Sequence, residues 1–216
     1  MKTKRLISIT TVLFLMISTL FFSSCSMKKG DYAIQEGAAA FQRKEFDKAI
    51  GLFQMGLSVE CSMSTPTVYI MISNCYSQKG DYDSAIEWRN KALEITEDSE
   101  NYLNLGMIYR IKQDDETAEK MFRKALDLDP DSAPAYASLG ALCITHDRID
   151  EALALFEEAE AINPRSGIIQ ADLAICYARK GDFEKADEHL GLAEDYKAEN
   201  LPQFKAEIES LRANHP

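Results

Sequence analysis

Apolar and polar residues alternate along this chain with the period of an α-helix, in short runs separated by polar turns. Two consecutive runs lie between residues 99 and 127. The first places three large apolar side chains on one face of a helix, at Tyr102, Leu105 and Tyr109. The second places the apolar residues Ala118, Phe122 and Ala125 on one face in the same way. We therefore predict two helices, over residues 99–111 and 115–127, whose apolar faces pack against each other.

The same pair of helices recurs along the chain. The pattern predicts four further pairs, over residues 31–43 with 46–59, 66–79 with 82–95, 133–145 with 149–161, and 167–179 with 183–195. The turns within the pairs carry Lys79-Gly80-Asp81, Asp114-Asp115, Asp147 and Lys180-Gly181-Asp182. Glycine in such a turn supplies a positive φ, and aspartate caps the helix that follows. A last amphipathic stretch predicts a helix that covers the end of the fifth pair, through Leu201, Phe204, Ile208 and Leu211.

Small, aromatic and proline residues recur at fixed positions in these units. The third unit has Tyr102, Leu105, Gly106, Tyr109, Ala118, Phe122, Ala125 and Pro130, and the fourth has Tyr136, Leu139, Gly140, Ala152, Phe156, Ala159 and Pro164. Gly106 and Ala118 are small where the two helices must approach closely. The chain resembles the tetratricopeptide repeat (TPR) family, whose period is about 34 residues. The second unit departs from the pattern at Ser73 and at Arg89, where neighbouring Trp88 is expected to supply the aromatic ring.

The resemblance implies an all-α fold, a right-handed superhelical solenoid of about five helix-turn-helix repeats with a C-terminal capping helix. The expected repeats lie near residues 30–65, 66–98, 99–132, 133–166 and 167–200, and residues 201–216 form the capping helix and tail. One helix pair cannot bury its own apolar face, so the core must form between stacked neighbours.

Residues 1–24 resemble a bacterial lipoprotein signal peptide. A basic start is followed by an uncharged apolar run over residues 6–22 and by small residues before Cys25. The resemblance implies cleavage before Cys25, attachment of lipid to this residue, and a lipidated tether over residues 25–29. Ser26 stands where an aspartate would retain the protein at the inner membrane, which favours the outer membrane. Ordinary secretion and an uncleaved membrane anchor are the alternatives.

Composition and motifs argue against several other functions. The 216 residues carry a formal net charge of −11, which repels phosphate backbones and disfavours nucleic-acid binding. The sequence contains no HExxH, paired CxxC, glycine-rich phosphate loop or GxSxG motif. None of the three histidines, which are His146, His189 and His215, has a second metal-ligating residue at the spacing of a metal site. We expect no metal, no cofactor and no enzymatic activity. Cys75, Cys143 and Cys176 stand at helix-packing positions and are expected to be buried apolar residues, and no disulfide is expected among them and Cys61.

By the resemblance, the first helix of each repeat lines a concave groove. The residues expected to contact a partner there are Ile70, Met71, Asn74, Gln78, Leu103, Asn104, Met107, Arg110, Ile144, Ile175 and Arg179. The first repeat adds Ile34, Gln35, Ala38, Phe41 and Gln42. A chaperone-type carboxylate clamp is disfavoured, because Ile70, Pro134 and Ser138 stand where its cations belong.

These observations predict a membrane-anchored envelope lipoprotein that acts as a protein–protein interaction scaffold. Its expected partner is an apolar peptide or helix of another protein, in envelope, secretin or pilus assembly, because methionines suit adaptable apolar contacts. The expected membrane contact is the lipid anchor. Two alternatives stay open: an accessory protein of a transport system that binds a small apolar ligand, and self-association through the capping helix. The sequence does not determine the oligomeric state.

Overall fold

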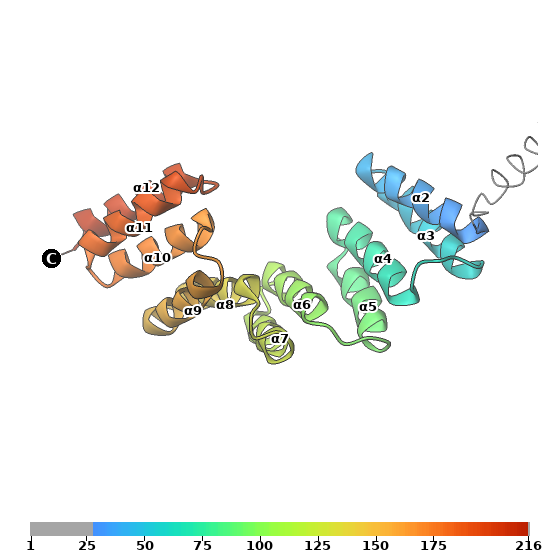
Figure 1. Cartoon of the computed structure of the whole chain (residues 1–216), viewed down its shortest axis with the longest axis horizontal. Helices are drawn as coiled ribbons and strands as arrows, with labels where there is room; N and C mark the ends of the chain where they lie inside the picture. Colours follow the sequence, from blue (N-terminus) through green and yellow to red (C-terminus); the bar gives the residue numbers. More distant parts are fainter. Residues whose placement is uncertain (1–27, 216) are drawn as a thin grey trace, which may run out of the picture. The chain divides into compact units, whose positions relative to one another are not determined.

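The computed structural model describes residues 28–215, and this part of the chain is built from eleven α-helices (Figure 1). In chain order they are α2 (Lys29–Gln42), α3 (Phe46–Ser58), α4 (Thr65–Lys79), α5 (Tyr82–Leu93), α6 (Ser99–Ile111), α7 (Asp115–Leu128), α8 (Ala133–Thr145), α9 (Ile149–Ile162), α10 (Gly167–Arg179), α11 (Phe183–Asp195) and α12 (Leu201–Ala213). None of these eleven has the length and apolar character that a membrane span requires. The predicted signal peptide and Cys25 lie outside the described residues.

Consecutive helices pack against each other in pairs. The closest packing joins α2 with α3, α6 with α7, α8 with α9, and α10 with α11. The chain divides into two compact units, which are described separately. The first unit ends at Cys75 and contains α2, α3 and most of α4; the second begins at Tyr76 and contains the remaining helices. The predicted fold class, all-α with sequential helix pairs, is confirmed.

In three of the pairs, a glycine on the first helix faces a phenylalanine on the second. These are Gly37 with Phe53, Gly106 with Phe122, and Gly140 with Phe156. A Cβ atom added at Gly106 would lie 2.4 Å from Cε1 of Phe122, far inside the ~3.5 Å at which carbon atoms pack. From the sequence, Gly106 was expected to approach Ala118 closely. The aromatic ring of Phe122 supplies the atoms nearest to Gly106, so this ring decides how close the helices come.

The turn within each helix pair contains one residue with a positive φ. These residues are Lys44 (61°), Gly80 (79°), Gln113 (62°), Asp147 (57°) and Gly181 (81°). A glycine adopts this conformation at little cost, whereas another residue is destabilised by about 1 kcal/mol. The expected positive φ at the two glycines is confirmed. Asp147 takes this backbone conformation instead of capping a helix.

Three of the expected capping aspartates do cap the helix that follows. Asp81, Asp114 and Asp182 each accept a hydrogen bond from a backbone N–H three residues further on, at 3.1–3.2 Å. The pKa of the Asp81 and Asp114 carboxyl groups is lowered, first by hydrogen bonds from the side-chain hydroxyl groups of Ser84 and Thr117 and then by these backbone bonds. The turn chemistry read from the sequence therefore positions the second helix of the pair.

The repeat-defining residues form the cores of the third and fourth pairs. Those that are buried are Tyr102, Leu105, Gly106, Ala118, Phe122, Ala125, Leu139, Gly140, Ala152, Phe156 and Ala159. Tyr109 and Tyr136 are half-buried beside them. The small and aromatic positions of the repeat are therefore the packing positions of the fold.

The last helix, α12, covers α10 and α11. Ile208 of α12 is fully buried in a cluster with Ala174, Ile175 and Ala186, and Phe204 and Leu211 pack at its edge. The apolar stripe of α12 thus buries surface of the fifth pair that would otherwise face solvent.

The second pair has a polar core position where the third and fourth pairs have phenylalanine. Arg89 is only 2% exposed, and its Nη1 donates a 2.7 Å hydrogen bond to Oδ1 of buried Asn101 on α6. The amide of Asn101 in turn donates to the carboxylate of Asp98. The expectation that Trp88 supplies the missing aromatic ring is wrong: Trp88 is half-buried, with the ammonium of Lys91 4.2 Å from its ring centre. Arg89 is thus buried with its Nη1 hydrogen-bonded to Asn101, whose own amide is held in place by Asp98.

Candidate functional site

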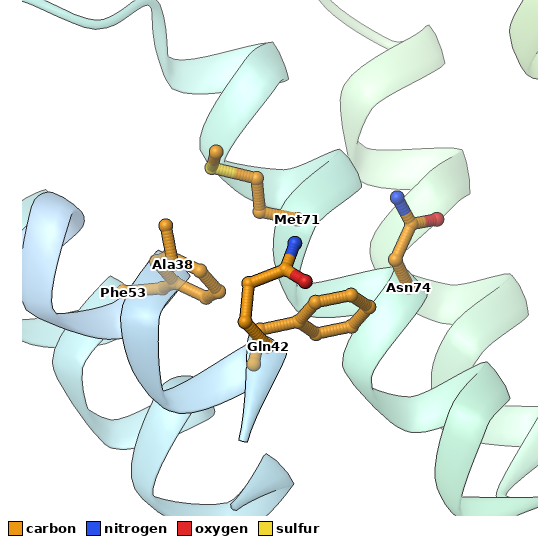
Figure 2. Close-up of a pocket in the computed structure, with 6 residues that line it drawn as sticks. Ala38, Gln42, Phe53, Met71 and Asn74 are labelled. Atoms are coloured by element: carbon orange, nitrogen blue, oxygen red, sulfur yellow. The ribbon is translucent and has the colours of Figure 1, made fainter. Parts of the chain in front are cut away.

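Two adjoining cavities lie in the first unit between α2 and α4, and Phe53 of α3 lines the smaller one. They have volumes of about 190 Å³ and 450 Å³, and Ala38 and Met71 line both of them. Figure 2 shows Ala38 and Gln42 of α2 and Met71 and Asn74 of α4 projecting toward the same space. The shared lining makes the two cavities one candidate binding site.

The smaller cavity has an apolar floor and a rim of amides. Its lining consists of Ala38, Phe41, Gln42, Phe53, Met71 and Asn74. Phe53 is 2% exposed, and its ring packs against Gly37. The glycine–phenylalanine contact of the repeat therefore also fixes the floor of the cavity. Phe41 is held by an edge-to-face contact with Phe46, with ring centres 5.6 Å apart. Rigid aromatic rings beside a flexible methionine suit an apolar side chain of varied shape.

The larger cavity is bounded by the loop between α3 and α4. Its lining consists of Asp31, Ile34, Gln35, Ala38, Ser62, Met63 and Met71. The backbone N–H of Ser62 donates to Oδ1 of Asp31 at 2.5 Å, and the Ser62 hydroxyl donates to Oδ2 at 2.9 Å. The first of these bonds lowers the pKa of the Asp31 carboxyl group below its usual value. Asp31 therefore stays ionised at neutral pH and holds the loop, with Met63, at the cavity.

Further contacts hold the same loop to the start of α2. The N–H of Gly30 donates to the carbonyl oxygen of Glu60 at 3.1 Å, and the Lys28 ammonium pairs with the Glu60 carboxylate at 2.7 Å. A Cβ at Gly30 would lie 2.6 Å from Cβ of Cys61, so the close approach requires glycine. The loop that looks irregular in sequence is thus a fixed wall of the site.

The lining residues favour binding over catalysis. Methionine, phenylalanine, alanine and isoleucine form the walls, and the polar groups at the rim are amides, one hydroxyl and one carboxylate. Among residues 28–215, no group of three or more His, Cys, Asp or Glu side chains is arranged to hold a metal ion. The thiols of Cys75, Cys143 and Cys176 are free, and burial raises their pKa values to about 11, 11 and 12. They are therefore protonated and poor nucleophiles at neutral pH.

Of the groove residues that the sequence predicted in the first unit, most line the cavities and one does not. Met71 and Asn74 line the cavities, together with the first-repeat residues Ile34, Gln35, Ala38, Phe41 and Gln42. Ile70 is half-buried and does not line either cavity.

In the second unit, Gln78, Met107, Arg110 and Arg179 are exposed, whereas Leu103, Asn104 and Ile144 are half-buried. Ile175 must be corrected. It is 3% exposed and packs in one cluster with Ile208 of α12, so α12 covers the side chain that was expected to face a groove.

Sequence reasoning missed four lining residues: Asp31, Phe53, Ser62 and Met63. In the sequence, Phe53 occupies the core position that Phe122 and Phe156 occupy in later repeats. The other three come together through the loop after α3, whose path is set by hydrogen bonds between residues about thirty positions apart. The irregular composition of residues 61–65 was the one available signal.

The described residues form helix pairs of similar length that are joined by tight turns and packed on their neighbours. An apolar hollow lies between the first helices of the first two pairs. These features define an all-α repeat protein with a candidate binding surface. The chain belongs to the tetratricopeptide repeat family, because two models of this repeat match it, one at residues 64–131 and 98–165 and the other at residues 144–213. Repeats of this family are modules of protein–protein interaction.

Solved structures share the fold. MamA superposes with a TM-score of 0.64 at 22% identity, covering 79% of this chain and 95% of MamA. YrrB, described as a TPR protein with an unusual peptide-binding site, superposes with a TM-score of 0.60 at 23% identity, covering 81% of this chain and 89% of YrrB.

Curated relatives are much longer proteins. The chain is 25% identical over 176 residues to anaphase-promoting complex subunit 3 of Schizosaccharomyces pombe, covering 74% of this chain and 26% of that protein. It is 29% identical over 119 residues to the human mitochondrial import receptor subunit TOM70, covering 55% of this chain and 19% of that protein. The chain therefore spans about a quarter of the first relative and about a fifth of the second.

Proposed function

We propose that this chain is a non-catalytic, lipid-anchored scaffold of a bacterial envelope that binds an apolar peptide or helix of another protein in the two cavities of its first unit. The observation that supports the binding site is the pair of adjoining apolar cavities that share Ala38 and Met71. Two neighbouring hollows accommodate two successive apolar side chains of one segment. Such a lipoprotein would serve in the assembly of the envelope, of a secretin or of a pilus.

The comparisons support peptide binding as a property of the fold family. YrrB is described by its peptide-binding site, and the two curated relatives are named as subunits of larger assemblies. The first unit of this chain has an apolar hollow of its own, and the amides of Gln42 and Asn74 supply hydrogen-bond donors and acceptors at its rim. Amides at the rim can bind the polar backbone of an extended segment or the side chains of a helix.

Replacing Met71 with glutamate should abolish partner binding. The new carboxylate would lie in both cavities and would lose its hydration when a partner covered it, so we expect affinity to fall about tenfold or more. A photo-crosslinking residue placed at Gln42, on the rim, should form a protein adduct in intact cells with the unchanged chain and lose it in the Met71→Glu variant. Mass spectrometry of the adduct would identify the partner.

Met55→Glu is the matched control, because Met55 lies on α3 of the same unit, is 56% exposed and lines neither cavity. Adduct formation should be unchanged in this variant, and both variants should keep the helical circular dichroism of the parent chain. An adduct that survives Met71→Glu unchanged would contradict the proposed binding site.

The volume of the larger cavity favours one alternative. About 450 Å³ falls within the ~300–1,000 Å³ of small-molecule sites, so a small apolar ligand of a transport accessory protein would also fit. A small apolar molecule that is recovered with the parent chain and Met55→Glu, but not with Met71→Glu, would support this alternative if no protein adduct forms.

The lipid anchor is supported by the basic start, apolar run and small residues that precede Cys25. Cys25→Ser should abolish incorporation of a palmitate analogue and release the chain from the membrane fraction, since stable anchoring needs the acyl chains. Cys61→Ser is the control and should keep the label. Labelling that persists in Cys25→Ser would exclude this anchor.

A further inference from the structure

The first helix pair has one end that lies close, along the chain, to the proposed lipid anchor. This end, called the tether end, consists of residues 28–32 at the start of α2 and residues 58–62 at the end of α3 and in the loop after it. The N–H of Gly30 donates to the carbonyl oxygen of Glu60, and the Lys28 ammonium pairs with the Glu60 carboxylate. These contacts hold the two segments together, so their exposed side chains belong to one fixed surface.

Two large apolar side chains are exposed at the tether end. Tyr32 of α2 is 60% exposed, and Val59, directly after α3, is 38% exposed. Lys29 lies one turn before Tyr32 on the same face of α2 and is exposed too. Within residues 28–215 no carboxylate forms an ion pair with Lys29. The tether end therefore presents a tyrosine ring, a valine and an unpaired ammonium group to solvent.

The proposed lipidation site is only a short length of chain away from this surface. Residues 26 and 27 alone stand between Cys25 and Lys28. Three steps of about 3.8 Å therefore keep the Cα atom of Lys28 within about 11 Å of the Cα atom of Cys25. With acyl chains on Cys25 inserted in the bilayer, the backbone of Cys25 lies at the membrane surface. The anchor thus holds the tether end near the lipid headgroups.

Charge also favours this end for contact with an anionic bilayer. The chain as a whole carries a formal net charge of −11, so acidic headgroups repel most of its surface. The tether end has two lysines and two carboxylates and is therefore neutral. The Glu60 carboxylate pairs with Lys28. The Asp31 carboxylate accepts a hydrogen bond from the Ser62 hydroxyl, which leaves the Lys29 ammonium for a lipid phosphate.

We propose that the tether end, through Tyr32, Val59 and Lys29, rests on the surface of the lipid bilayer that holds the anchor. The Tyr32 ring would lie at the level of the headgroups, where tyrosine is favoured because its ring is apolar and its hydroxyl stays hydrated. Val59 would add apolar contact, and Lys29 would extend its ammonium to the phosphates. This inference rests on the lipid anchor of the proposed function and adds which side of the first helix pair touches the membrane.

Fluorescence quenching by brominated lipid tests this contact. The chain has one tryptophan, so Trp88→Phe removes the background and allows a new tryptophan to report from a chosen position. The lipidated full chain is reconstituted into vesicles of phosphatidylethanolamine and phosphatidylglycerol, with or without acyl chains that are brominated near the headgroup. We expect bromine to lower the fluorescence of the Tyr32→Trp variant about twofold, because the indole ring would also lie at the headgroup level.

Lys48→Trp, in the same Trp88→Phe background, is the matched control. Lys48 is exposed near the start of α3, in the same helix pair, about 15 Å along the helix axis from Ser58 at the tether end. Bromine should leave the fluorescence of this variant nearly unchanged. Both variants should keep the helical circular dichroism of the parent chain and its palmitate label.

The part of Lys29 is tested in the same vesicles. In the Tyr32→Trp background, Lys29→Glu should reduce the quenching by about half, since a lysine close to an anionic surface is attracted to it and a glutamate is repelled. Lys48→Glu makes the same change of charge away from the tether end and should leave the quenching intact.

The outcomes separate this inference from the proposed function. Equal quenching of the Tyr32→Trp and Lys48→Trp variants, or no quenching of Tyr32→Trp in a chain that carries the palmitate label, would overturn the membrane contact and leave the anchor standing. A chain that carries no label would overturn the anchor and the contact together. Equal effects of Lys29→Glu and Lys48→Glu would overturn the part assigned to Lys29.

Discussion

Replacing Gly106 with leucine should lower the free energy of unfolding by about 1–3 kcal/mol or more, because the new side chain has no space. Even a Cβ atom at this position would lie 2.4 Å from Cε1 and 2.5 Å from Cδ1 of Phe122. The ring of Phe122 is fully buried and cannot move aside without displacing its neighbours Leu139 and Leu142. Urea and thermal unfolding, followed by circular dichroism at the helical wavelengths, measure the loss.

Gly191→Leu is the matched control, because Gly191 also lies within a helix, α11, and a Cβ there would meet nothing within 4 Å. This change should raise stability by up to about 1 kcal/mol, since leucine is the better helix former. Opposite signs at the two glycines would confirm that contact with Phe122, and not backbone conformation, requires Gly106. Equal effects would mean that the α6–α7 packing described here is wrong.

Replacing Arg89 with alanine should cost about 3 kcal/mol, which is typical for removing one partner from a buried polar network. Arg89 is 2% exposed and Asn101 is 1% exposed, so Asn101 would lose its 2.7 Å hydrogen bond in a place that water does not reach. The cavity left by the side chain adds to the loss. Burial also lowers the pKa of Arg89, which reflects how little water surrounds its charge.

Arg165→Ala serves as the control for Arg89→Ala. Arg165 is exposed in the loop between α9 and α10, where a substitution should change stability by less than about 0.5 kcal/mol. Denaturant unfolding of the two variants gives the comparison directly. Similar midpoints for both would show that the Arg89–Asn101–Asp98 network contributes nothing to the stability of the second unit.

Local signals predicted most of the helices and their pairing. Period and turn residues are properties of short segments, so Gly80, Gly181 and the capping aspartates could be interpreted without knowledge of distant contacts. The same holds for Met71 and Asn74, whose positions on the first helix of a repeat placed them at the cavities. Segments without a repeat pattern gave no such guidance, which is why the loop wall at Ser62 and Met63 was missed.

The sequence by itself determined which side chains share a helix face, because helical geometry converts spacing into direction. Only the tertiary structure decided which of those faces stay open, because burial depends on the neighbour that packs on top. Ile175 has the position of a groove residue and is buried because α12 lies over it. Arg89 has the position of an aromatic residue and is buried because Asn101, from the next helix, accepts its hydrogen bond. Asp31 closes a cavity because a loop about thirty residues away in the chain folds back to donate two hydrogen bonds to it.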